Sequence, residues 1–81
     1  MKSAKEMFDE LGYKRFENDY WVYYSKETNS SYFASRVTFI KNEKTFGIEK
    51  FSANGILTKN ITVKELQAII QQCKELGWSD E

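Results

Sequence analysis

Two short segments near the ends of this 81-residue chain close in almost the same way, and they restrict its fold more than any other feature. The first reads Asp-Glu-Leu-Gly-Tyr at residues 9–13, and the second reads Lys-Glu-Leu-Gly-Trp at residues 74–78. A glycine in this position can adopt the left-handed conformation that ends a helix, and an apolar residue after it can fold back onto that helix. We therefore predict a short amphipathic helix near each end of the chain.

The first helix has a start signal as well as a stop signal. Ser3 and Glu6 have the spacing of a capping box, in which each side chain accepts a hydrogen bond from the other residue's backbone N–H. We predict a helix over residues 4–11, with Tyr13 folded back over Phe8. Its apolar residues recur at the spacing of one helical face, and they are Ala4, Met7, Phe8 and Leu11.

The second helix repeats this pattern. Thr62 and Glu65 form the capping box, and the predicted helix covers residues 63–76. Trp78 is expected to pack over Cys73 beyond the helix end. The stripe predicted to be buried consists of Leu66, Ile69, Ile70, Cys73 and Leu76.

The segment between the helices is rich in Tyr, Phe, Val, Ile and Thr, which is typical of strands. Four strands are predicted, over residues 13–17, 20–26, 31–40 and 45–51. The connections between them are too short for the crossovers of a parallel sheet, so the sheet should be an antiparallel meander. The predicted fold class is α+β. It is a single domain over residues 1–81, with both helices packed on one face of the four-stranded sheet.

Loop lengths predict how the strands pair and which side chains share a face. A loop at 41–44 pairs Phe39 with Phe46, and a loop at 27–30 pairs Tyr24 with Phe33. The first strand fits less well, because a two-residue turn would place Arg15 on the core face, so we expect a bulge or a longer turn there. The predicted core face carries Tyr20, Val22, Tyr24, Phe33, Val37, Phe39, Phe46 and Ile48.

The residues available for chemistry argue against an enzyme. The chain contains no histidine, which removes the usual general base near neutral pH and the commonest metal ligand. It has no Cys/His zinc spacing and no glycine-rich phosphate loop. Glu17 and Asp19 flank a turn, where exposed acidic residues are common. We therefore predict a protein that is not an enzyme and that uses no cofactor and no metal.

The single cysteine and the absence of long apolar runs bear on where the protein resides. Cys73 has no partner for an internal disulfide, which fits a reducing cytoplasm. We expect the thiol to pack in the core; the alternative is a thiol that is oxidised when the helix frays. No stretch has the apolar run of a secretory signal or of a membrane span. The expected location is the cytoplasm.

The outer face of the predicted sheet is the candidate binding surface, and its residues are Trp21, Tyr23, Tyr32 and Arg36. Trp, Tyr and Arg are the residue types enriched in binding hot spots. The alternative is purely structural, with Trp21 stacked on Arg36 as a cation–π pair and Glu49 completing the cross-strand row.

The two ends of the chain resemble small phage and prophage proteins of Gram-positive bacteria, most of them uncharacterised. The resemblance lies in residues 4–13 and in residues 61–69 followed by Glu75–Trp78. It implies a shared fold and an origin in a mobile element, and it carries over no activity or site.

Two functions follow from these features as hypotheses. The first is a non-enzymatic accessory module that binds an unidentified protein partner or a second copy of itself. The alternative is single-stranded nucleic-acid binding, in which bases stack on the outer aromatic residues. Zero net charge, from twelve basic and twelve acidic residues, argues against generic binding to nucleic acid or to anionic membranes.

Overall fold

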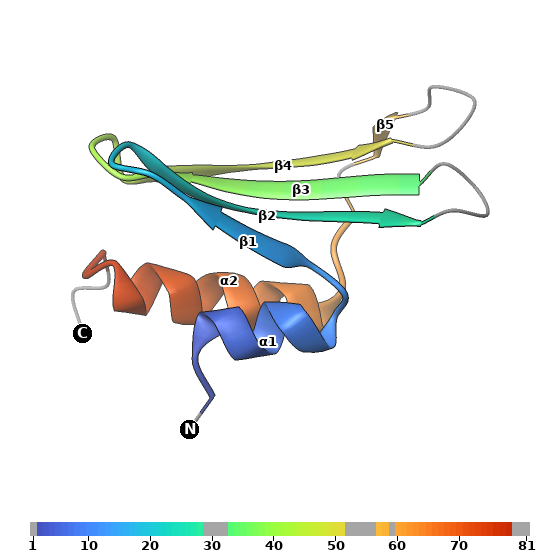
Figure 1. The fold of residues 1–81 in the computed structure, drawn as a ribbon, viewed down its shortest axis with the longest axis horizontal. Helices are drawn as coiled ribbons and strands as arrows, with labels where there is room; N and C mark the ends of the chain where they lie inside the picture. Colours follow the sequence, from blue (N-terminus) through green and yellow to red (C-terminus); the bar gives the residue numbers. More distant parts are fainter. Residues whose placement is uncertain (1, 29–32, 52–56, 59, 79–81) are drawn as a thin grey trace.

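The computed structural model describes residues 2–28, 33–51, 57–58 and 60–78. Two helices lie side by side under one face of an antiparallel sheet (Figure 1). The sheet has the strand order β1-β2-β3-β4-β5, so the predicted α+β meander of four strands is confirmed, and a two-residue strand extends it. The elements are α1 (Ala4–Glu10), β1 (Lys14–Glu17), β2 (Trp21–Thr28), β3 (Phe33–Ile40), β4 (Thr45–Phe51), β5 (Leu57–Thr58) and α2 (Val63–Glu75).

Local signals define both helices as predicted. The capping boxes at Ser3 and Thr62 are both complete. Gly12 has φ 91° and Gly77 has φ 77°, a region that residues with a Cβ rarely adopt, and this explains why glycine follows each helix. The ring of Tyr13 meets the ring of Phe8 edge-on, with centroids 5.3 Å apart. Tyr13 therefore folds back onto α1, as predicted.

The pairing of β3 with β4 is the predicted one, but the pairing of β2 with β3 is not. Phe39 faces Phe46 as expected. Tyr24 faces Val37 instead of Phe33, because β2 continues to Thr28, two residues beyond its predicted end, and β3 begins at Phe33. The register is therefore shifted by an even number of residues, which keeps each side chain on its predicted face. In the observed register, apolar core residues oppose one another, with Val22 against Phe39 and Tyr24 against Val37.

Arg15 lies on the core face, and the expected bulge or longer turn is not observed. Arg15 faces Tyr24, and Glu17 faces Val22. The Asn18 N–H donates a hydrogen bond to the Trp21 carbonyl oxygen at 2.9 Å, so the turn lies one residue further along the chain, which keeps Arg15 on the same face. The Arg15 guanidinium donates hydrogen bonds to the Tyr24 hydroxyl at 2.7 Å and to Gln72 Oε1 at 3.1 Å. A cation is tolerated here because it is hydrogen-bonded at the edge of the core.

The core is a compact aromatic and aliphatic cluster between the sheet and the helices. Phe8 of α1 stacks on Tyr24 of β2 with ring centroids 3.9 Å apart. Cys73, Leu76 and Trp78 pack against the cluster from the end of α2. In the part of the chain that the structure describes, the fully buried hydrophobic residues are Ala4, Phe8, Tyr13, Val22, Tyr24, Val37, Phe39, Ala68 and Ile69.

The predicted position of Tyr20 on the core face is wrong, whereas Phe46 lies on that face but is only partly buried. Tyr20 lies in the turn before β2 and is 68% exposed. Phe46 reaches the core through its contact with Phe39, with ring centroids 5.8 Å apart, but remains 45% exposed. The side chain of Phe33, a third member of that set, lies outside the described part of the structure.

Helix α2 buries only part of the predicted stripe, namely Ile69, Cys73 and Leu76, which lie in or against the core. Leu66 and Ile70 are exposed by 42% and 47%, whereas Glu65 and Gln72 are buried. The helix is therefore rotated about its axis relative to the hydrophobic pattern. This rotation is possible because Glu65 and Gln72 both accept hydrogen bonds from side chains on the strands of the sheet.

The Glu65 carboxylate is the centre of the buried polar contacts. Its Oε1 accepts hydrogen bonds from Lys50 Nζ and from the Thr62 N–H, each at 2.8 Å, and its Oε2 accepts one from the Tyr13 hydroxyl at 2.5 Å. The Ser35 hydroxyl lies 2.7 Å from that of Tyr13. Burial by itself would raise the pKa of Glu65, but these donors outweigh it and lower the pKa to about 2.

The rotation of α2 predicts unequal costs for two similar substitutions. Ile69→Ala should lower the free energy of unfolding by about 2–4 kcal/mol, because it removes a buried side chain. Leu66→Ala should lower it by less than about 1 kcal/mol, because much of that side chain is already exposed. Urea denaturation followed by circular dichroism measures both. Equal costs would contradict the observed rotation.

The Glu65 contacts predict a specific sensitivity to acid. The carboxylate has a pKa near 2 in the folded protein against an ordinary 4.5, so its stabilising contribution is complete above pH 4.5 and is lost as the pH falls toward 2. Glu65→Gln should lower the free energy of unfolding at neutral pH by roughly 3 kcal/mol, because it leaves Lys50 buried without a counter-charge.

The pH dependence of unfolding then separates Glu65 from other carboxylates. In Glu65→Gln, the loss of stability between pH 4.5 and 2 should be smaller than in the wild type by on the order of 2 kcal/mol. Glu17→Gln is the comparison variant. The pKa of Glu17 is also lowered to about 2, but its side chain is much more exposed, so solvent screening should make its effect on the pH profile smaller. Identical pH profiles for Glu65→Gln and the wild type would show that this carboxylate is not the acid-sensitive group.

Candidate functional site

The sheet face opposite the helices is the candidate binding surface. Both helices lie on the same side of the sheet (Figure 1), and no described element lies against the other side. The register places Phe16 opposite Tyr23, and Trp21 opposite Ile40. We call Phe16, Trp21, Tyr23 and Arg36 the outer aromatic face.

The centre of this face is a stack of three side chains from three neighbouring strands. Phe16 of β1 and Tyr23 of β2 are nearly parallel, with centroids 4.9 Å apart and an interplanar angle of 17°. The guanidinium carbon of Arg36, on β3, lies 5.1 Å from the centroid of the Tyr23 ring. Tyr23 is half-buried between its two neighbours. The stack therefore holds aromatic surface and a cation in a fixed arrangement.

Trp21 borders this stack without joining it. It is 38% exposed, and the ring of Tyr20 lies beside it with centroids 6.4 Å apart. The predicted Trp21–Arg36 pair is wrong, because in the observed register Arg36 faces Ser25 and lies over Tyr23 instead. The structure thus places three of the four predicted site residues on one face of the sheet, and of these Tyr23 and Arg36 are in contact. Tyr32, the fourth, lies outside the described residues.

Phe16 belongs to the site although sequence reasoning did not include it. Its side chain is 44% exposed and forms the outer end of the stack. The signal that could have identified it was the alternation of β1, in which Arg15 and Glu17 face the core and Phe16 must then face outward. Sequence reasoning did not use that signal, because a charged Arg15 on the core face favoured a different turn after β1.

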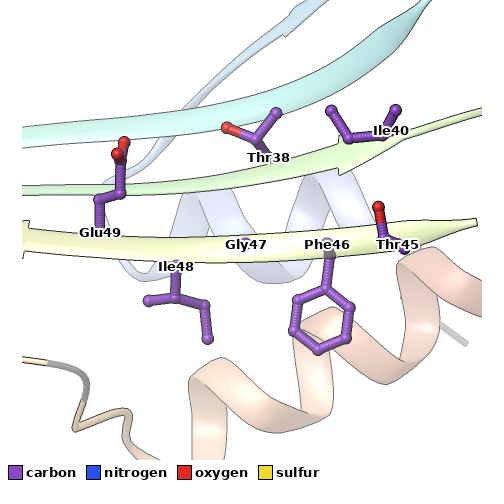
Figure 2. Close-up of a pocket in the computed structure, with 7 residues that line it drawn as sticks. All are labelled: Thr38, Ile40, Thr45, Phe46, Gly47, Ile48 and Glu49. Carbon is purple, nitrogen blue, oxygen red and sulfur yellow. The ribbon is translucent and has the colours of Figure 1, made fainter. Parts of the chain in front are cut away.

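The outer face becomes shallower toward β4. Tyr23, Thr38 and Gly47 follow Phe16 along one cross-strand row, so side-chain size falls from one edge to the other. A hollow of about 350 Å³ opens at the Gly47 end. Figure 2 shows Thr38, Thr45 and Glu49 on one side of the strands, and Phe46 and Ile48 on the other.

The charges on the outer face balance. By the register, the charged residues on this side of the described strands are Lys14, Arg36, Glu27 and Glu49. Two are basic and two are acidic, so the face has no basic field that would attract a phosphate backbone.

Two ionisable groups on the helix side of the sheet, Glu17 and Cys73, have shifted pKa values. Hydrogen bonds from Arg15 and Lys41 lower the pKa of the Glu17 carboxyl to about 2. Burial raises the pKa of the Cys73 thiol, which favours the unreactive neutral form and agrees with the predicted packing role. Within residues 2–28, 33–51, 57–58 and 60–78, no group of three or more acidic, histidine or cysteine side chains is placed to hold a metal ion.

Comparisons of the chain with protein-family models, with curated proteins and with solved structures found no match. Neither helix in the described part of the chain is long and apolar enough to cross a membrane. The arguments about function therefore depend on the geometry of the surface.

The stack predicts which outer residue contributes to stability. Tyr23→Ala should lower the free energy of unfolding by about 1–2 kcal/mol, because it removes the contacts to Phe16 and Arg36 together. Tyr23→Phe keeps the ring and should change it by less than about 0.5 kcal/mol. Chemical denaturation of both variants measures this difference. A loss in Tyr23→Phe as large as in Tyr23→Ala would assign the effect to the hydroxyl instead of the stack.

Proposed function

We propose that the protein is a non-enzymatic interaction module that binds a protein partner through its outer aromatic face. The observation that carries this proposal is the stack of Phe16, Tyr23 and Arg36, with Trp21 beside it, on the sheet face that no described element covers. Partly exposed aromatic side chains beside an arginine are the composition typical of interface hot spots.

The fixed geometry of the stack supports binding as well as its composition. Tyr23 is held between two neighbours, so little side-chain entropy is lost when a partner covers it. Phe16 and Trp21 are 44% and 38% exposed, which leaves apolar area that a partner would remove from water. The balanced charges around them favour a mixed protein surface over a polyanion.

An affinity pull-down with matched surface variants tests this proposal. The resemblance of both chain ends to proteins of phages and prophages supports lysate from a Gram-positive host as the source of partners, and a cytoplasmic location as the setting. The binding variant is Phe16→Ser with Trp21→Ser, which leaves Tyr23 in place. The control is Val63→Ser, which removes an exposed apolar side chain from α2, on the other side of the sheet.

A partner retained by the wild type and by Val63→Ser, but lost from the double variant, would support the proposal. Circular dichroism must show that all three proteins are folded. Equal capture by all three would contradict a binding role of the outer aromatic face. A nuclease-treated arm shows whether any captured protein is linked through nucleic acid.

Single-stranded nucleic-acid binding is the second candidate, favoured by the same stacked rings and by Arg36 at their end. A fluorescence titration with mixed-sequence oligonucleotides at low salt tests it, with Trp21→Phe as the blank. Quenching that is absent from the blank would favour nucleic acid over a protein partner. No quenching at micromolar oligonucleotide would remove this candidate.

A further inference from the structure

Strand β4 has an edge that is only partly paired. It pairs with β3 from Thr45 to Phe51. On its other edge, β5 pairs only with Lys50 and Phe51. Among the described residues, the stretch Thr45–Glu49 therefore has no strand beside it on that side. The unpaired N–H and C=O groups of such an edge are a template for another strand.

Apolar side chains gather at the same edge, on the helix side of the sheet. Phe46 points toward that side in Figure 2 and is 45% exposed. Leu66 and Ile70 of α2, exposed by 42% and 47%, lie one turn apart on one side of the helix.

The position of α1 shows which way the side of α2 that carries Leu66 and Ile70 faces. Glu75 accepts a hydrogen bond from the Ala4 N–H, so α1 lies on the Glu75 side of α2. Leu66 precedes Glu75 by nine residues, which at 100° per residue places it on the opposite side of the helix. Since α1 packs on β1, the side of α2 that carries Leu66 faces toward β4.

The hollow at Gly47 extends around the same edge. Its lining includes Thr45 and Glu49 from the outer side of β4, and Phe46 and Ile48 from the helix side (Figure 2). A Cβ added to Gly47 would meet no atom within 4 Å. The edge is therefore open both along its backbone and above its central residue.

We propose that this edge pairs antiparallel with the same edge of a second copy of the chain, about a two-fold axis at Gly47. The occupant must be an extended strand, because the edge offers a row of backbone donors and acceptors. An isologous pair needs a self-complementary stretch. The stretch Thr45–Glu49 has Gly47 at its centre and ends where β5 begins to pair.

The side chains favour this register over the two registers that are shifted by two residues. Centred on Gly47, the pairing sets Phe46 against Ile48 of the partner subunit on the helix side, and Thr45 against Glu49 of the partner subunit on the outer side. A shift of two residues either way would set a lysine, Lys44 or Lys50, against Ile48 or Phe46. Zero net charge means that two copies approach without overall repulsion.

Cysteine cross-linking tests the register directly. In a Cys73→Ala background, Gly47→Cys places the two introduced thiols opposite each other at the axis, where neighbouring Cα atoms are about 4.5–5.5 Å apart. Mild oxidation should convert this variant to a covalent dimer. Thr45→Cys alone, or Glu49→Cys alone, should not cross-link, since identical positions lie about 13 Å apart along the strands. A mixture of the two should form the mixed dimer.

Sedimentation equilibrium tests association without a cross-link. The mass of the wild type should rise with concentration toward twice the 9.6 kDa of the chain. Phe46→Lys should remain at the mass of one chain, because it places a cation against an apolar neighbour at the edge. Phe16→Ser with Trp21→Ser should dimerise as the wild type does, so this result is independent of the proposed partner binding.

Three results would overturn the proposal. The first is a wild type that stays at the mass of one chain up to its solubility limit. The second is a dimer that Phe46→Lys leaves intact. The third is cross-linking of Thr45→Cys alone as efficient as that of Gly47→Cys, which would show a different register or random collision.

Discussion

The rest of the structure depends on one buried carboxylate, that of Glu65. It accepts hydrogen bonds from Lys50 of β4, from the Tyr13 hydroxyl in the segment between α1 and β1, and from the Thr62 N–H at the start of its own helix. A buried charge is tolerated only when its partners are all in place. Each of the segments that supply these partners is therefore held to a single position relative to the others.

This constraint sets the rotation of α2. Glu65 turns toward the sheet at one end of the helix, and Gln72 accepts hydrogen bonds from Tyr24 and Arg15 further along. With both polar side chains inward, Leu66 and Ile70 remain at the side of the helix, beside the open edge of β4. The polar contacts of the core thus decide which apolar surface the protein leaves exposed.

The two proposed surfaces use different parts of the sheet. The outer aromatic face lies over β1, β2 and β3, whereas the proposed dimer edge belongs to β4. A two-fold axis perpendicular to the sheet would place both outer aromatic faces on the same side of one continuous sheet. Such a dimer would present two copies of the binding surface to a partner, and two linked contacts bind more tightly than one.

Local features of the sequence determined the helices, their caps and the alternation of faces along each strand, because these depend on residues that are close in the chain. The capping boxes at Ser3 and Thr62 and the glycines after each helix needed nothing else. Tertiary structure decided the β2–β3 register, the outward position of Phe16 and the burial of Glu65. A loop displaced along the chain keeps the alternation while changing every partner, and a polar residue can be buried only when distant residues supply its hydrogen bonds.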